Sequence, residues 1–237
     1  MRPPPDWLDT LPRDRLIAEI SLWSADLGRL AEEIARVDAH ADLYHIDVAD
    51  GHFAPALLFF PDLVAACRRR TAKPLHVHLM ARDAILRDQI RQFADAGADA
   101  ISLHAENGTL DHGLDLVQRL GLVSGVVLQL DTPVAAANAV IERIGLLTLL
   151  GTRIGIKGQD LDGAAERRLS EARALAAGRV TPGRVLVCAD GGIREGTVPG
   201  LARAGAETIV MGSLAFGAQD LAARMAFVHA QPRARGA

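Results

Sequence analysis

Residues 43–53 read LYHIDVADGHF, and the interpretation of the whole chain starts from this stretch. Its first half favours a β-strand, and the Asp-Gly pair that follows is typical of a turn. Side chains alternate along a strand, so His45 and Asp47 face one side while their apolar neighbours face the other. The pair is either half of a metal site or a hydrogen-bonded pair in the core, and the other strand ends must decide between the two.

Apolar runs of similar length recur along the chain. We expect strands at residues 17–23, 43–48, 74–80, 100–104, 123–130, 146–151, 184–189 and 208–211. Several of the stretches between them have apolar side chains at helical spacing, which predicts helices at 84–96, 134–143, 161–177 and 198–204. Strands that alternate with helices favour right-handed crossovers and a parallel sheet.

Eight such units in 237 residues match a (β/α)₈ TIM barrel, an α/β fold with eight parallel strands. A doubly wound open sheet is the alternative, but no G-x-G-x-x-G follows the first strand. We expect one barrel domain at residues 16–230, an N-terminal extension at 1–15 and a C-terminal tail at 231–237. In the extension, Trp7 and Leu8 either cover the lower end of the barrel or have no structural role.

The composition is that of a globular protein with a large core, at 49% hydrophobic and 23% charged residues. A net charge of −3 argues against nucleic acid or an anionic membrane as partner. The chain has two cysteines, and its acidic N-terminus has no apolar signal segment, so we expect a reducing, cytoplasmic location. We also expect a homo-oligomer, with Phe59 and Phe60 either burying a loop or contacting another subunit.

Three of the predicted strand ends have side chains that bind metals, and TIM-barrel chemistry takes place at the carboxyl ends of strands. His45 and Asp47 lie on the second strand, His76 and His78 share a face of the third, and Asp190 ends the seventh. Two imidazoles and two carboxylates can bind one Zn, Mn, Fe or Co ion. We expect His76 to be a wall residue or to support a ligand. Asp190 has an alternative role in forming the Asp-Gly-Gly turn.

The two carboxylates also predict acid–base chemistry. A bound divalent ion acidifies the C–H beside a carbonyl, because it stabilises the enediolate that forms when the proton leaves. One Asp can remove that proton from one face, and the other can return a proton to the opposite face. The expected result is epimerisation of the carbon.

Glycine-containing loops at three adjacent strand ends predict a phosphate site. The residues are Gly155 and Gly158 after the sixth strand, Gly191 and Gly192 after the seventh, and Gly212 with Ser213 after the eighth. Without a side chain in the way, backbone N–H groups can approach an anion closely. Turns need glycine in any case, so the prediction depends on the three loops together.

With these motifs the chain resembles the ribulose-phosphate 3-epimerase family over residues 20–217. The matching motifs are SLWSADL, HIDVADGHFAP, VHLM, ADGGI and GSLAFG. The resemblance implies a TIM barrel of the ribulose-phosphate-binding type. It also implies interconversion of D-ribulose 5-phosphate and D-xylulose 5-phosphate, a reaction of the pentose phosphate pathway.

The resemblance further implies roles for individual residues. A divalent metal ion would be held by His45, Asp47, His78 and Asp190, with Asp47 as proton acceptor and Asp190 as donor for the opposite direction. The implied contacts to the sugar phosphate are Ser21, His78, Gly155, Ile156, Lys157, Gly158, Gly191, Gly192, Gly212 and Ser213.

Departures from the family pattern leave the substrate open. They lie at Ala49, Gln129, Leu130 and Leu150, and across residues 153–159, which read RIGIKGQ where the family commonly has NPGFGGQ. Arg153 and Lys157 add two cations that either bind phosphate or a second anionic group, or point to solvent. The alternatives are an epimerase for another ketose phosphate such as allulose 6-phosphate, a metal-dependent hydrolase or lyase, and a non-catalytic sugar-phosphate-binding barrel.

Overall fold

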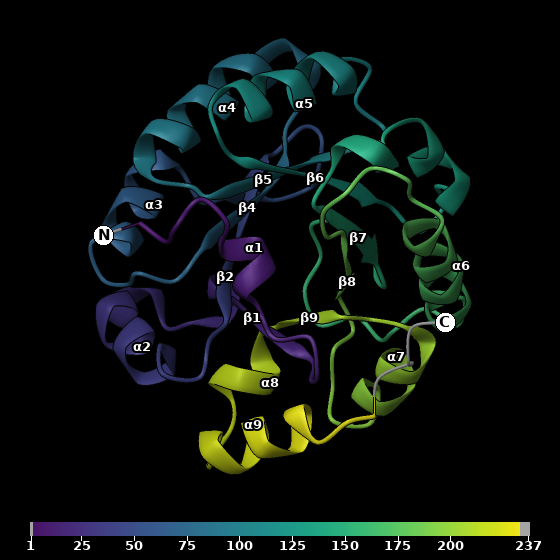
Figure 1. Cartoon of the computed structure of the whole chain (residues 1–237). Coiled ribbons are helices and arrows are strands. Elements are labelled where there is room, and N and C mark those ends of the chain that lie inside the picture. Colours follow the sequence, from purple (N-terminus) through teal and green to yellow (C-terminus); the bar gives the residue numbers. More distant parts are fainter. Residues whose placement is uncertain (1, 233–237) are drawn as a thin grey trace.

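The computed structural model describes residues 2–232 and shows a closed ring of parallel strands surrounded by helices (Figure 1). The barrel strands are β1 (Ile17–Ser21), β2 (Leu43–Asp50), β4 (Leu75–Met80), β5 (Ala100–His104), β6 (Val123–Leu128), β7 (Leu146–Leu150), β8 (Leu186–Asp190) and β9 (Thr208–Met211). Each pairs in parallel with its neighbours, and pairing of β1 with β2 closes the ring. The predicted TIM barrel is confirmed, because an open sheet would leave two edge strands unpaired.

Helices form the outer layer of the barrel (Figure 1). They are α2 (Leu30–Val37), α3 (Pro61–Arg68), α4 (Asp83–Ala96), α5 (Leu110–Arg119), α6 (Ala165–Ala177), α7 (Val198–Ala204), α8 (Ser213–Phe216) and α9 (Leu221–His229). Short 3₁₀ helices lie at η1 (Leu22–Ser24), η2 (Leu27–Arg29), η3 (Val134–Ala139) and η4 (Ile141–Arg143). The sequence did not indicate β3 (Leu57–Leu58), a two-residue strand antiparallel to β2.

The largest error in the predicted elements is the helix expected at residues 134–143. The structure has η3 and η4 there, with backbone bonds that span three residues, such as Val140 N–H to the Ala137 carbonyl at 3.0 Å. Val134, Ala137 and Val140 are buried, and their spacing of three matches the 3₁₀ repeat rather than the α-helical one. The other helices and strands differ from prediction mainly at their ends, as for β1, which stops at Ser21 where the chain turns into η1.

Most of the apolar core lies between the strands and the surrounding helices. The interior of the barrel contains layers of inward-facing side chains, and its lowest layer is apolar: Ile17, Leu43, Ala100, Leu146 and Leu186. Two positions further along these strands the layer becomes polar, with Glu19, His45 and Ser102 fully buried. On β1 and β2 the inward face therefore changes from apolar to ionisable towards the carboxyl end, and on β5 it changes to a hydroxyl.

The N-terminal segment closes the lower end of the barrel. Its short helix α1 (Trp7–Thr10) lies in the centre of the ring in Figure 1. Trp7 is 4% exposed and packs with Leu11 against the lowest apolar layer. Arg184, just before β8, fixes the segment by donating to the Leu11 and Pro12 carbonyls, both at 2.9 Å.

Trp7→Ala should therefore lower the free energy of unfolding by about 3–5 kcal/mol, the usual cost of truncating a buried tryptophan. Equilibrium urea denaturation measures this loss. Trp23→Ala is the matched control, because Trp23 is only half-buried and should cost less. A loss in Trp7→Ala well below this range, and no larger than that of the control, would contradict a stabilising role of the N-terminal segment.

In residues 2–232, no helix has both the length and the apolar character needed to cross a bilayer. Both cysteines, Cys67 and Cys188, are buried and free. Of the expected C-terminal tail, residues 233–237 lie outside the described part of the chain.

Candidate active site

Strand register brings the predicted metal ligands together at the carboxyl end of the barrel. On neighbouring strands β2 and β4, Asp47 is the register partner of His78, and His45 is that of His76. Asp190 is the last residue of β8, which is not a neighbour of β2 or β4 in the ring. Because the strands are parallel, side chains far apart in the sequence point into one end of the barrel.

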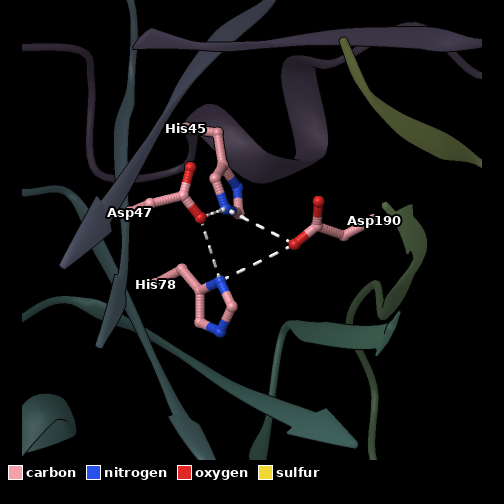
Figure 2. Close-up of side chains that lie close together, drawn as sticks. All are labelled: His45, Asp47, His78 and Asp190. Atoms are coloured by element: carbon pink, nitrogen blue, oxygen red, sulfur yellow. Dashed lines mark hydrogen bonds and ion pairs between the residues drawn. The ribbon is translucent and has the colours of Figure 1, made fainter. Parts of the chain in front are cut away.

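Four side chains converge on a common centre (Figure 2). His45 Nε2 lies 3.2 Å from Asp47 Oδ1 and 3.8 Å from Asp190 Oδ2. His78 Nδ1 lies 3.3 Å and 3.6 Å from the same two oxygens. Ligands placed tetrahedrally about a zinc-like ion at 2.0–2.2 Å are about 3.4 Å apart, so these separations suit one ion.

The arrangement of the donor atoms also fits a metal ion. Among the described residues, His78 Nδ1 has no hydrogen-bond partner although it is buried, and it points to the centre. Its other nitrogen, Nε2, lies 2.8 Å from His104 Nε2, and His104 Nδ1 lies 3.1 Å from a Glu106 carboxylate oxygen. Ser21 Oγ donates to Asp47 Oδ2 at 2.9 Å, which leaves Oδ1 towards the centre. We call His45, Asp47, His78 and Asp190 the metal group.

The two carboxylates of the metal group have different electrostatic surroundings. Burial acts to raise the pKa of Asp47, but the neighbouring imidazoles of His45 and His78 outweigh it and lower that pKa. Burial raises the pKa of Asp190, and the nearby Asp47 charge adds to this effect. Two acidic groups in one site are thus biased towards different protonation states, as acid–base pairs in enzymes are.

A cavity of about 420 Å³ opens above the metal group. It is lined by almost every residue predicted to contact substrate or metal: Ser21, Asp47, His78, Gly155, Ile156, Lys157, Gly158, Asp190, Gly191, Gly192, Gly212 and Ser213. His45 is fully buried beneath this cavity. The volume of the cavity is in the range of small-molecule sites.

The loop after β8 requires glycine for its backbone conformation. Gly191 and Gly192 have φ angles of 89° and 70°, in the left-handed region where other residues are strained. A Cβ on Gly192 would also lie 2.7 Å from the Leu161 Cα. Backbone N–H groups of this loop therefore border the cavity without side chains in front of them.

Both extra cations of residues 153–159 line the cavity. The Lys157 ammonium donates to the Trp23 carbonyl and lies 5.0 Å from the centre of the Trp23 ring. Burial lowers the pKa of Lys157, while the Asp47 charge acts in the opposite direction. Lys157 is thus held over the cavity by Trp23, although both Lys157 and Arg153 are exposed.

Some residues of the site were missed from the sequence. Trp23 and Arg194 line the cavity but were not predicted as contacts, although Trp23 lies in the SLWSADL motif and Arg194 directly follows ADGGI. Glu19 is fully buried and lies 2.7 Å from His45 Nδ1. A sequence signal for Glu19 did exist, because it alternates with Ser21 on a strand that is otherwise apolar.

Comparison with known proteins gives a consistent result. Residues 17–216 match the model of the ribulose-phosphate 3 epimerase family. Ribulose-phosphate 3-epimerase 1 of Cupriavidus necator is 36% identical over 206 residues, covering 84% of each chain. The ribulose-phosphate 3-epimerase of Bacillus subtilis is 36% identical over 203 residues, covering 84% of this chain and 92% of its own.

Solved structures with the same fold are more distant. A 3-hexulose-6-phosphate synthase aligns with a TM-score of 0.65 at 19% identity, covering 92% of this chain and 99% of its own. The orotidine 5'-phosphate decarboxylase of Pyrococcus horikoshii has a TM-score of 0.64 at 15% identity, covering 93% and 100%. At these identities the likeness supports the fold alone.

The TIM barrel, the side chains at the carboxyl ends of its strands and the sequence matches define an enzyme of the isomerase class, a carbohydrate epimerase. More narrowly, the chain belongs to the ribulose-phosphate 3-epimerase family.

Proposed function

We propose that this enzyme interconverts D-ribulose 5-phosphate and D-xylulose 5-phosphate by epimerisation at C3. The observation that carries the proposal is the convergence of two carboxylates and two imidazoles on one point beneath a cavity bordered by three glycine-containing loops. The names of the relatives support the same substrate.

The metal group would hold one divalent cation, of the Zn, Fe, Mn or Co type. When bound, this cation supplies electrostatic stabilisation of the charge that develops on the substrate oxygens beside C3. His45 Nε2, His78 Nδ1 and one oxygen of each carboxylate would hold it.

Asp47 and Asp190 would carry out the two proton transfers. They extend from β2 and β8, which are separated by other strands in the ring, so they can address different faces of a bound sugar. Asp47, the carboxylate with the lowered pKa, would accept the proton at C3. Asp190, with the raised pKa, would deliver a proton to the opposite face, and their roles would reverse for the other epimer.

The phosphate would lie against the loops at Gly155–Gly158, Gly191–Gly192 and Gly212–Ser213, which border the cavity. Backbone N–H groups in such loops bind anions well. Lys157 and Arg153 would add positive charge to this end of the cavity.

A second candidate substrate is another ketose phosphate, such as allulose 6-phosphate. Lys157 favours this possibility, because its ammonium is held over the cavity by Trp23 and changes the wall that faces the substrate. The epimerisation chemistry would be the same.

Incubation with a panel of ketose phosphates in deuterated water tests both candidates. With ribulose 5-phosphate we expect the C3 hydrogen to be replaced by deuterium, together with formation of xylulose 5-phosphate and no release of phosphate. Nuclear magnetic resonance identifies the labelled carbon. Faster exchange with a hexulose 6-phosphate would assign the second substrate, and exchange at another carbon would contradict the proposal.

The proposal includes a cytoplasmic location and a homo-oligomer. Two buried, free cysteines support a reducing environment. Exposed Leu57 and Phe60 support a contact between subunits.

A further inference from the structure

A fully buried carboxylate lies beside the metal group and has no part in the proposed proton transfers. Glu19 on β1 is 0% exposed. One of its oxygens, Oε1, lies 2.7 Å from His45 Nδ1 and 2.6 Å from His76 Nδ1. Burying a carboxylate is unfavourable even when it is hydrogen-bonded, so replacement by an apolar residue would be the simpler way to fill the barrel.

The contact with Glu19 determines which nitrogen of His45 carries the ring proton. A carboxylate only accepts hydrogen bonds, so His45 Nδ1 donates to Glu19 at 2.7 Å. In the neutral ring, Nε2, whose contact with Asp47 Oδ1 is longer at 3.2 Å, then offers its electron pair to a cation. Nε2 is the atom that faces the centre of the metal group (Figure 2). In the other tautomer the proton would lie on Nε2 and block binding of a cation.

We propose that Glu19 is a positioning residue of the metal centre, which fixes the orientation and tautomer of His45 so that Nε2 is available to the divalent cation. Carboxylates that hold metal-binding histidines in this way raise metal affinity in other proteins. The inference rests on the proposed metal site but not on the identity of the sugar.

His76 holds Glu19 in place from the other side. It donates to Glu19 through Nδ1, and its Nε2 lies 2.6 Å from Ser102 Oγ. Ser102, His76, Glu19 and His45 thus form a continuous buried chain across β5, β4, β1 and β2. His76 therefore acts on the cation site indirectly. It holds Glu19, and Glu19 holds the ligand His45.

A second cation between Glu19, His45 and His76 is the competing explanation, because these three side chains also lie close together. Their contacts of 2.6 and 2.7 Å are those of N–H···O hydrogen bonds. Ligand atoms placed tetrahedrally around one zinc-like ion are about 3.3–3.6 Å apart, so the shorter contacts of Glu19 are hydrogen bonds rather than the edges of a second metal site. The geometry favours one cation per chain.

Glu19→Gln in the full-length protein tests the inference. The amide cannot accept from two ring N–H groups with the strength of a carboxylate, and its own N–H₂ favours the wrong tautomer of His45. We expect Zn²⁺ affinity, measured by competition with a chromophoric chelator, to fall by about 10–100-fold. The visible spectrum of bound Co²⁺ should change as well, and Glu19→Asp, which keeps the charge, should restore part of the affinity.

Glu207→Gln is the matched control. Glu207 is also a buried carboxylate, but it lies just before β9 and is ion-paired to Arg184 at 3.4 Å. This variant should lose stability and keep the native Zn²⁺ affinity. An effect of the Glu19 variant through general destabilisation would appear in the control too, and that result would overturn the inference.

Other outcomes are equally decisive. Native affinity and an unchanged Co²⁺ spectrum in Glu19→Gln would overturn the inference, as would two cations per native chain. If the variant does not fold, the ¹⁵N spectrum of the histidine rings in the native zinc-loaded protein decides: His45 should carry its proton on Nδ1, and a proton on Nε2 contradicts the inference. Native protein that binds Zn²⁺ without epimerising any sugar would refute the proposed function alone, whereas native protein that binds no Zn²⁺ would refute both.

Discussion

Asp47→Asn and Asp190→Asn are each expected to lower turnover of ribulose 5-phosphate by about 10²–10⁴-fold, the usual contribution of a general acid or base. An amide neither accepts the C3 proton nor returns one, and the partner residue extends from a strand that is not a neighbour in the ring. The barrel should remain folded, because both side chains lie at its open end, above the apolar layers. A coupled assay for xylulose 5-phosphate measures the loss.

Both residues also belong to the metal group, so the cation content of each variant has to be measured alongside turnover. A variant that retains its cation should still exchange the C3 hydrogen of one epimer with solvent, because one base remains, while inversion is lost. Asp50→Asn is the matched control, since Asp50 lies on the same strand as Asp47 but caps the turn by accepting from the His52 and Phe53 N–H groups. Substantial turnover in either active-site variant would refute the two-base scheme.

The repeat of strands and helices could be predicted from the sequence because each barrel strand is a short apolar run. The predicted ends were less accurate. Residues 129–130 were assigned to a strand that stops at Leu128, because apolar character alone does not show where hydrogen bonding to a neighbour ends. The 3₁₀ helices at 134–143 were missed since a spacing of three and a spacing of three to four share most of their apolar positions.

The metal group was predictable for a different reason. Alternation along a strand placed His45 beside Asp47 and His76 beside His78, and the rule that TIM-barrel sites lie at carboxyl strand ends brought Asp190 to them. Strand register could not be predicted in this way. Glu19 contacts His45 and His76 only because β1, β2 and β4 are neighbours in a particular alignment, with Ser21 paired to His45. No local pattern in the sequence carries that information.

The loop at residues 153–159 shows a second limit. The sequence shows its two cations, but it does not show whether their side chains point into the site or to solvent. The structure resolves this for Lys157, because contact with Trp23, which follows β1, holds the ammonium over the cavity. That contact joins residues more than a hundred positions apart, and neither residue lies in a motif that predicts it.

Removal of the divalent cation by chelation is expected to abolish turnover, and added Zn²⁺, Fe²⁺, Mn²⁺ or Co²⁺ should restore it. Abstraction of the C3 proton leaves negative charge on the neighbouring oxygens. The cationic side chains that line the cavity, Arg153, Lys157 and Arg194, are not part of the metal group. The metal group itself contributes two carboxylates, which without a cation would repel a developing negative charge. With the cation bound, the site stabilises negative charge near C3, whereas after chelation the two carboxylates repel it.

Thermal unfolding supplies a readout that does not depend on catalysis. A cation that binds only the folded state stabilises it by about 2.7 kcal/mol at a free concentration one hundred times its dissociation constant, so the melting temperature should fall on chelation and recover on addition of metal. A variant with both His45→Ala and His78→Ala should show no such response, since half of the metal group is gone. Full activity in thoroughly metal-free native protein would mean that the four converging side chains act without a cation, and the acidity of the C3 proton would then have to come from hydrogen bonds alone.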